Sequence, residues 1–518
     1  MASCAEWSAG GRTIGGVVGR VLSKSKLIAY RQCPKRVWLE VHRPDLREDS
    51  AQAQARFDSG HQVGDIARRL YDPKGTGALL DPQKEGFDSA LARTRELLDS
   101  PQPIFEAGFR TEAALAFADV MLPVRKAGKL AWKMVEVKSA TSVKDYHLDD
   151  AAIQVFVARA TGVALASASV ACIDSAWVYP GGGDYSGLLH ETNVTDQALG
   201  REAEVRGWIA DAQRVVADTQ EPTVKMGKQC SAPFECGFSA YCQGLVLAAE
   251  YPISQLPGKF GKALQALIDA EDLTDLRDVP DDLLNDKQLR VKEAALSGRT
   301  FFDKTAAAQA LAPHKLPAYF MDFETIQFAV PIWKGTRPYQ QIPFQFSVHR
   351  LSRTGKLAHQ SFLDLSGEDP SHGFAKALLE ACGETGPVFA YNAGFEKSRI
   401  QELATRFPRL AVALSALAER VVDLLPVARA HYYHPDQEGS WSIKAVLPSL
   451  CPDLDYTQLD GVQNGGMAME AYAEGLAATT TPERKAEIER QLIAYCALDT
   501  LALVRLWSAF SGSKLAIA

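Results

Sequence analysis

Long hydrophobic runs are missing from this sequence. No stretch of its 518 residues approaches the ~20 consecutive apolar residues that a membrane-spanning helix needs, and residues 1–20 contain no long apolar core of the secretory kind. These absences argue against a membrane-spanning or secreted protein, so we expect a cytoplasmic protein with no membrane partner. The chain is still 47% hydrophobic, and it is too long for a single core, which predicts about two or three domains.

An overall positive charge is also missing. The net charge of -7 gives the whole molecule no field that attracts nucleic acid. Two local stretches differ from this average. Residues 21–43 carry six Lys or Arg against Glu40 alone, and residues 333–359 carry five with no acidic residue. A solvated surface is one interpretation of each stretch; aromatic residues interleaved with the second favour contact with nucleic acid as the other.

Cysteine is sparse, and its nine copies are an odd number. In a reducing cytosol, clustered cysteines are more often metal ligands than disulfides. Cys230, Cys236 and Cys242 fall within thirteen residues of a loop-forming stretch, and Cys33 ends a helix that Ser23 is expected to cap. A single cysteine is usually a small core residue, but three local thiols and one distant thiol make a set of four. Four thiolates accept zinc or an iron-sulfur cluster, so the residues alone leave the metal open.

The stretch 134–140 contains the most informative pair of charged residues in the first half of the chain. Glu136 and Lys138 are two residues apart, so they share one face of a predicted strand. Asp119 lies in a second apolar segment, 115–122, and the turn between the segments predicts a hairpin. Two carboxylates and a lysine can hold a hard divalent cation and stabilise charge on a phosphate. A salt pair on an amphipathic strand is the alternative interpretation.

These residues, with Gln154 in a predicted helix and cysteines on both flanks, resemble the RecB-like branch of the PD-(D/E)XK nuclease superfamily that carries an iron-sulfur cluster. The resemblance implies a [4Fe-4S] cluster bound by the four cysteines, with zinc as the alternative. It also implies that His61, Asp119 and Glu136 bind the catalytic metal ion, that Lys138 is catalytic, and that Gln154 positions the substrate. The sequence departs from the family at Ala158, where a tyrosine is customary, and in its longer spacing between the second and third cysteines.

The second half of the chain contains a second set of acidic residues in predicted strands and helices. Asp322 and Glu324 are two residues apart in an expected strand, 319–325. Glu396 follows another apolar segment that begins at residue 388, and Asp423 lies within a third, at 420–424. Tyr495 and Asp499 are four residues apart, which makes them neighbours on one helix face.

This order of motifs resembles the DEDD exonucleases of the RNase H-like fold. The resemblance implies that Asp322, Glu324, Glu396 and Asp499 hold two metal ions and that Tyr495 orients the attacking water. Glu396 stands where the family has an aspartate, and Asp423 is a candidate to compensate. Phrases such as 337–345 and 439–448 are similar to those of an uncharacterised bacterial family that joins a RecB-like module to a DEDD-type module.

We therefore expect an α/β, multi-domain protein. Its parts would be a flexible tail (1–20), a RecB-like PD-(D/E)XK restriction-endonuclease-like module stapled by the cluster (21–248), a helical connector (249–315) and an RNase H-like DEDD exonuclease domain (316–518). The resemblances imply a Mg²⁺- or Mn²⁺-dependent deoxyribonuclease with two active sites, one a 3′-5′ exonuclease, in DNA repair or defence against foreign DNA. RNA processing by the second module and a non-catalytic nucleic-acid-binding scaffold with relic sites remain the alternatives.

Overall fold

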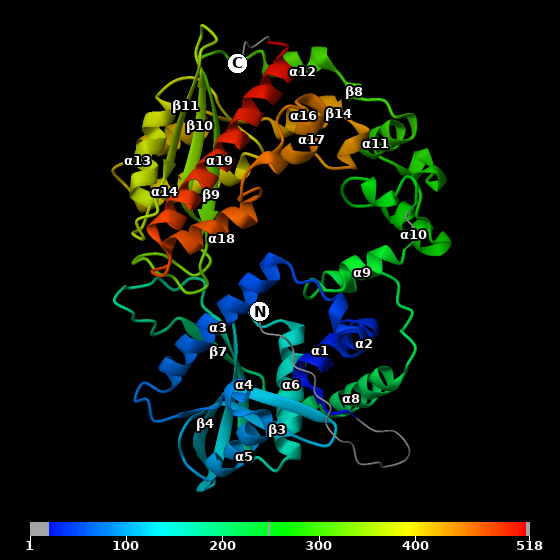
Figure 1. Cartoon of the computed structure of the whole chain (residues 1–518), viewed down its shortest axis with the longest axis vertical. Coiled ribbons are helices and arrows are strands. Elements are labelled where there is room, and N and C mark those ends of the chain that lie inside the picture. The colour runs from blue at the N-terminus through cyan, green and yellow to red at the C-terminus, as the bar shows by residue number, and fades with distance from the viewer. Residues whose placement is uncertain (1–19, 247–248, 514–518) are drawn as a thin grey trace. The chain divides into compact units, whose positions relative to one another are not determined.

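The computed structural model describes residues 20–246 and 249–513, which form two compact units (Figure 1). Of the described residues, unit 1 contains those up to Val246 together with Phe328–Gln340, and unit 2 contains residues 249–327 and 341–513. The protein is α/β and multi-domain, as expected. The predicted tail at 1–20 lies outside the described residues except for Arg20. The predicted connector belongs to unit 2.

Unit 1 is built on a seven-stranded sheet with the order β2-β3-β4-β5-β6-β7, and β1 pairs with β4. The strands are β1 (Leu22–Ser23), β2 (Ala78–Leu79), β3 (Ile104–Arg110), β4 (Ala114–Lys126), β5 (Lys129–Lys138), β6 (Leu165–Ile173) and β7 (Leu189–Asn193). The predicted hairpin is confirmed as β4 and β5. Its turn consists of Ala127 and Gly128, which both have positive φ angles.

The helices of unit 1 include the two that the sequence predicts, the helix that begins after Ser23 and the helix that contains Gln154. They are α1 (Lys24–Gln32), α2 (Pro34–His42), α3 (Ala51–Tyr71), α4 (Pro82–Glu85), α5 (Phe87–Leu97), α6 (Asp145–Ala160), α7 (Thr195–Gly200), α8 (Glu202–Ala217) and α9 (Ser239–Gly244). Ser23 caps α1 as expected, because its side chain accepts a hydrogen bond from the Lys26 N–H. The sequence of residues 169–178 predicts a strand, but β6 ends at Ile173, because the Asp174 carboxylate accepts the Ala176 N–H and starts a turn.

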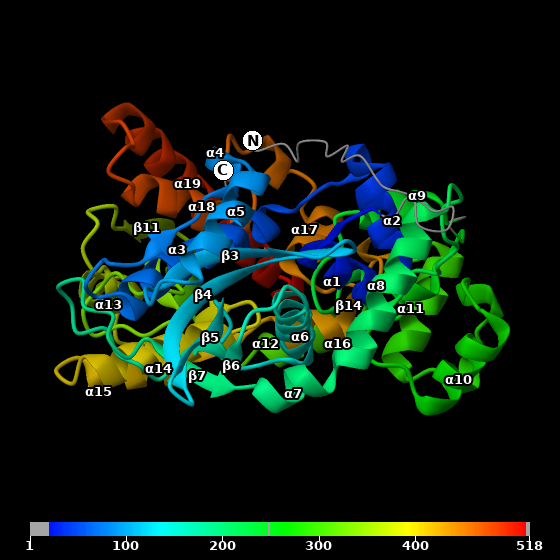
Figure 2. The same ribbon diagram turned by 90° about the horizontal axis from the view of Figure 1, so that it is seen from below.

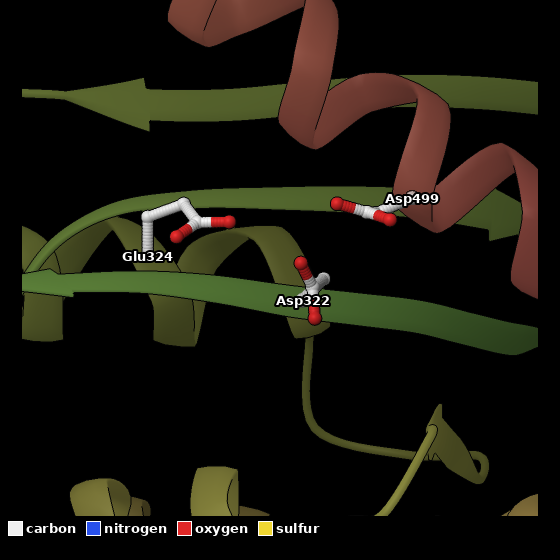
Figure 3. A group of neighbouring side chains, drawn as sticks. All are labelled: Asp322, Glu324 and Asp499. Atoms are coloured by element: carbon white, nitrogen blue, oxygen red, sulfur yellow. The ribbon is translucent and has the colours of Figure 1, made fainter. Parts of the chain in front are cut away.

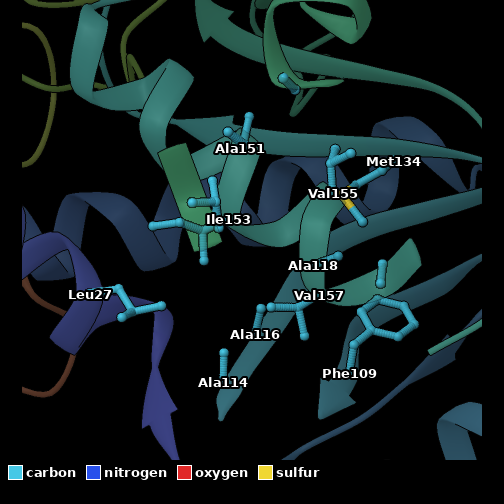
Figure 4. Packing of buried hydrophobic residues seen from close by; sticks show 14 of the residues in the cluster. Leu27, Phe109, Ala114, Ala116, Ala118, Met134, Ala151, Ile153, Val155 and Val157 are labelled. Carbon is cyan, nitrogen blue, oxygen red and sulfur yellow. The ribbon is translucent and has the colours of Figure 1, made fainter. Parts of the chain in front are cut away.

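Helix α6 packs against β4 and β6 on one face of this sheet (Figure 2). The small side chains of Ala114, Ala116 and Ala118 on β4 allow the helix to approach closely, and Ile153 and Val157 of α6 fill the space (Figure 4). Burial of this apolar surface is the main stabilisation of unit 1. It also fixes the face of β5 on which polar side chains meet α6.

Unit 2 contains a five-stranded sheet with the order β11-β10-β9-β12-β13. The strands are β9 (Ala318–Ile326), β10 (Ile342–Leu351), β11 (Leu357–Leu363), β12 (Val388–Ala390) and β13 (Val421–Asp423), and a separate pair is formed by β8 (Phe301–Phe302) and β14 (Tyr432–Tyr433). Strands β9 to β11 are antiparallel, while β12 is parallel to β9 and β13 is parallel to β12.

The helices of unit 2 pack on this sheet and around it. They are α10 (Lys262–Glu271), α11 (Asp286–Ser297), α12 (Lys304–Leu311), α13 (Ser371–Cys382), α14 (Gly394–Arg406), α15 (Ala411–Glu419), α16 (Leu425–His431), α17 (Ile443–Leu450), α18 (Gly465–Leu476) and α19 (Pro482–Ser511). The sequence of the connector predicts a helical hairpin from residues 273–280 and 286–297. The structure contains only the second of these helices, as α11. The first segment forms a single 3-10 turn, because the Asp275 carboxylate accepts the Arg277 N–H and Pro280 prevents a longer helix.

The two faces of the unit 2 sheet are covered by different helices (Figure 1). Met321 and Phe323 pack toward α13, α14 and α15, whereas Phe320 packs against Trp507 of α19. Among the described residues, α19 is the one helix long and apolar enough to cross a membrane by length and composition, and 56% of its apolar window is buried. Its packing in the core of unit 2 accounts for that composition.

Candidate functional site

Three carboxylates converge in unit 2. Asp322 and Glu324 extend from the α19 face of β9, and Asp499 extends from α19 (Figure 3). One ligand oxygen from each residue lies within 4.8 Å of the others, and no other such group of three His, Cys, Asp or Glu side chains occurs in residues 20–246 and 249–513. Convergent carboxylate oxygens are the ligands that Mg²⁺ and Mn²⁺ prefer, so this donor set fits those ions.

The pKa values of these acids show that the site is short of positive charge. Burial, followed by repulsion from Asp499 and Glu324, raises the pKa of Asp322 well above its ordinary range. Burial and the charge of Asp499 raise the pKa of Glu324 to about 8. Burial raises the pKa of Asp499 to about 6, although the hydrogen bond from Tyr456 acts to lower it. A divalent cation would relieve this repulsion.

Glu396 lies in the first turn of α14, outside the group of three. It is 5% exposed, its Oε2 has no hydrogen-bond partner among the described residues, and burial raises its pKa to about 7. Its charge adds to the repulsion at Asp322, so it borders the same site. Asp423 instead accepts hydrogen bonds from the backbone N–H groups of Asn392 and Leu425, both at 2.9 Å, and is occupied in holding this loop.

Tyr495 lies one turn before Asp499 on α19, and a hydrogen bond from its side chain helps to lower the pKa of that acid. Sequence reasoning missed two further residues. Tyr456 donates a hydrogen bond of 2.6 Å to Asp499 Oδ1, and the ammonium of Lys444 lies 4.8 Å from the centre of the Tyr456 ring. No fixed spacing relates these two residues to the acidic motifs. The one available signal is that Lys444 falls within the phrase 439–448.

In unit 1 the structure brings four predicted residues together at the end of β5. Lys138 Nζ lies 2.6 Å from Glu136 Oε1. Gln154 of α6 donates a hydrogen bond to Glu136 Oε2 and another, of 3.1 Å, to the carbonyl of Phe117. Asp119 accepts a 2.7 Å hydrogen bond from the N–H of Val137, which places its carboxylate beside Glu136. Gln154 therefore holds the carboxylate of Glu136 in place.

Lys24 and Asp150, which the sequence did not reveal, complete this arrangement. Lys24 Nζ lies 2.8 Å from Glu136 Oε1 and 3.2 Å from Asp150 Oδ1, and Lys138 contacts the same two carboxylates. Although burial acts to raise it, the two lysines hold the pKa of Glu136 below its ordinary value. The first site thus has two lysines in direct contact with its carboxylates, whereas no ion pair joins a lysine to Asp322, Glu324 or Asp499 in the described part of unit 2.

Glu106 of β3 is a further acid at this site. Its φ of +57° is in the left-handed region, which is rare for residues other than glycine, and the pairing of β3 with β4 skips Glu106 and Asp119. Burial and the charge of Glu136 raise the pKa of Glu106, and burial raises that of Asp119. Backbone strain of this kind concentrates at functional sites. The predicted ligand His61 is exposed on α3 and joins no group of three ligating side chains among the described residues.

The four predicted cysteines line one small cavity in unit 1. Cys33 lies between α1 and α2, while Cys230, Cys236 and Cys242 come from the loop before α9 and from α9 itself; all four are free thiols. Gln32 joins the two parts, because its side-chain amide donates to the carbonyls of Gln229 and Phe234 at 2.7 and 2.8 Å. Four thiolates are a donor set that zinc and a [4Fe-4S] cluster both accept, although no three of these sulfurs lie within 4.8 Å of one another.

Comparison with known proteins adds one match. No curated protein matches the chain. The sequence model of one family, described as Domain of unknown function (DUF2779), matches residues 319–442, a segment that contains Asp322, Glu324 and Glu396 and ends before Asp499. Over that segment the chain is similar to a domain to which no function is assigned.

Proposed function

We propose that unit 2 is a Mg²⁺- or Mn²⁺-dependent nuclease that hydrolyses phosphodiester bonds at the 3′ ends of DNA. The convergence of Asp322, Glu324 and Asp499 is the observation that carries this proposal. Divalent ions held by these carboxylates would activate a water and stabilise the leaving oxygen of an in-line displacement. Tyr495 and Tyr456 would orient Asp499, and Glu396 would supply a further carboxylate at the edge of the site.

The sheet of unit 2 supports an RNase H-like fold for this proposal. Three antiparallel strands, β9 to β11, are extended by β12 and β13, with β12 parallel to β9. The two acids on β9 face α19, the helix that supplies the third acid. A strand and a helix that present acids to each other suit a two-metal site, because both elements are rigid.

For unit 1 we propose a PD-(D/E)XK-type nuclease module whose ends are joined by a [4Fe-4S] cluster, with zinc as the alternative metal. The antiparallel strands β3, β4 and β5, the helix α6 and the parallel strand β6 support this fold. Asp119, Glu136 and Lys138 would carry the chemistry. Bound metal would require both lysines to release Glu136, since each contacts that carboxylate.

The neutralised carboxylate of Glu136 favours a second candidate function for unit 1 alone. Both lysines contact Glu136 and Asp150, so these carboxylates are not free to hold a catalytic cation, as expected of a module that binds nucleic acid without cleaving it. Unit 1 would then be a DNA-binding scaffold for the nuclease in unit 2.

The test is digestion of end-labelled single-stranded DNA, double-stranded DNA and RNA with Mg²⁺, with Mn²⁺ and in chelator. We expect stepwise release of nucleotides from 3′ ends of DNA that stops in chelator. Asp322→Asn should abolish that release, since the lost charge removes a metal ligand and with it about 10²- to 10³-fold or more in rate. The exposed Glu384→Gln in the same unit is the matched control. Full activity in chelator would refute the metal mechanism, and RNA cleavage alone would reassign the substrate.

A further inference from the structure

The side chain of Lys444 is held beside the carboxylates of unit 2 by several specific contacts. It lies in the first turn of α17, which begins after Ser442, whose hydroxyl accepts the Ala445 N–H at 3.2 Å. Its ammonium donates a 2.7 Å hydrogen bond to the carbonyl of Gln463. It also lies over two aromatic rings, 4.8 Å from the centre of Tyr456 and 5.2 Å from that of Tyr495. A carbonyl and two aromatic faces hold a cation in place without cancelling its charge.

The charge of Lys444 reaches the acids, although the side chain does not pair with them. Its positive charge acts to lower the pKa of both Glu324 and Asp499. Yet no carboxylate in the described part of the chain lies within the 4.0 Å of an ion pair with Lys444, whereas the lysines of unit 1 contact their carboxylates directly, at 2.8 Å for Lys24 and 2.6 Å for Lys138. Lys444 is therefore a cation held next to the acids and left available for a different anion.

The ring of Tyr456 connects this cation to the acidic group. Its face lies under the ammonium of Lys444, while its hydroxyl donates to Asp499 Oδ1 at 2.6 Å. Tyr495 makes a similar connection, because its ring also lies under the ammonium of Lys444 and the hydrogen bond from its side chain helps to lower the pKa of Asp499. The two tyrosines thus fix the spacing between the Lys444 ammonium and the Asp499 carboxylate. A fixed spacing is needed if both groups act on the same phosphate.

We propose that Lys444 is a further catalytic residue of the unit 2 site, whose ammonium binds a non-bridging oxygen of the scissile phosphate. This inference rests on the proposed nuclease function. In the hydrolysis a water oxygen forms a bond to phosphorus, the bond from phosphorus to the leaving oxygen breaks, the water loses a proton to solvent and the leaving oxygen takes one up. Negative charge on the non-bridging oxygens is then stabilised by Lys444, which stays protonated throughout.

The test compares Lys444→Gln, which removes the charge but keeps a donor for the Gln463 carbonyl, with Lys444→Arg, which keeps the charge. The exposed Lys376→Gln on α13 is the matched control. On the full-length protein, kcat/KM for labelled DNA should fall about 100-fold in Lys444→Gln and recover most of that loss in Lys444→Arg. Calorimetric titration with Mg²⁺ alone should show unchanged or tighter binding in Lys444→Gln, since a like charge near the metal ligands is lost.

A merely structural role would give a different pattern. If Lys444 only anchors the loop of Tyr456 and Gln463, both variants should weaken Mg²⁺ binding and lower the temperature of thermal unfolding together with cleavage, and that result would overturn the inference. Unchanged cleavage in Lys444→Gln would overturn it as well. If Lys444→Gln does not fold, the test uses Lys444→Arg alone. A folded Lys444→Arg that binds Mg²⁺ normally but no longer cleaves DNA would overturn the inference, because this variant keeps the positive charge. Absence of any cleavage by the wild type would instead refute the proposed function itself.

Discussion

At the scale of single residues, the protonation of Glu324 couples stability to pH and to metal. In the metal-free protein the pKa of this acid is raised from 4.5 to about 8. The folded state then keeps a proton that the unfolded state releases between these values, so this stabilisation is full below about pH 4.5 and is lost as pH rises toward 8. We expect the thermal unfolding temperature of unit 2 in chelator to fall as pH rises from about 5 to about 8, by an amount equivalent to a few kcal/mol.

Added Mg²⁺ should restore the unfolding temperature at about pH 8, because the ion binds the ionised carboxylates of the folded state and not the unfolded chain. Glu324→Gln should reduce the pH dependence, to which the raised pKa values of Asp322 and Asp499 also contribute, and should weaken the effect of Mg²⁺. The exposed Glu384→Gln should leave both as in the wild type. Calorimetric scans over this pH range with and without the ion make the measurement. Stability that rises with pH in chelator would contradict the assignment of a raised pKa.

Some residues of the two sites can be predicted from their spacing in the sequence, and others cannot. The pairs Asp322 and Glu324, and Glu136 and Lys138, could be placed on common strand faces because the side chains of a strand alternate with a period of two. Lys24 and Lys444 could not be placed, since the first reaches Glu136 across 112 residues and the second belongs to a helix with no fixed offset from the acids. Such contacts depend on tertiary packing, on which local periodicity carries no information.

At the scale of elements, the cysteine loop and helix α1 depend on each other. The loop before α9 contains no strand and little helix, and Gln32 holds it through two hydrogen bonds. In our proposal the metal bound by the four thiols holds it as well. Protein purified without oxygen should contain iron and acid-labile sulfide in equal amounts. Cys33→Ser should lose both and should lower the unfolding temperature of unit 1, because metal binding closes a long loop. Cys172→Ser, a buried cysteine of β6 that does not line the cavity, should keep the iron and sulfide. If the purified protein contains zinc and no iron, the four cysteines form a zinc site and not an iron-sulfur cluster.

Elements were easier to predict than the ends of elements. The hairpin of β4 and β5 and the helix that carries Tyr495 and Asp499 follow from hydrophobic periodicity over many residues. The early end of β6 at Ile173 and the missing helix at 273–280 were decided by single carboxylates, Asp174 and Asp275, that bind nearby backbone N–H groups. A side chain competing with the helix or strand for one hydrogen bond leaves no periodic signal.

At the scale of the whole molecule, each unit has its own sheet and its own group of acidic residues, so the two proposed activities should be separable. Glu136→Ala should remove any cleavage or DNA binding that unit 1 provides and leave 3′-end release intact, whereas Asp322→Ala should do the reverse. A product ladder from end-labelled DNA for the wild type, both single variants and the double variant makes the measurement, with the exposed Glu112→Ala and Glu384→Ala as controls. If either single variant abolishes every product, the two acidic groups form one composite site.

The segment Phe328–Gln340 links the two units in an unusual way. It joins β9 to β10, both strands of unit 2, yet it belongs to unit 1, where Ala329 and Val330 pack with Val63 and Ile66 of α3. The Tyr339 hydroxyl of this segment donates a hydrogen bond to the carbonyl of Ser139, the residue after Lys138. The coding sequences of the two units therefore do not simply follow one another in the gene, because a part of unit 1 is encoded within the sequence of unit 2. A gene truncated after codon 248 would encode unit 1 without part of its core, and recombination could exchange unit 2 between relatives only through paired junctions on both sides of this segment.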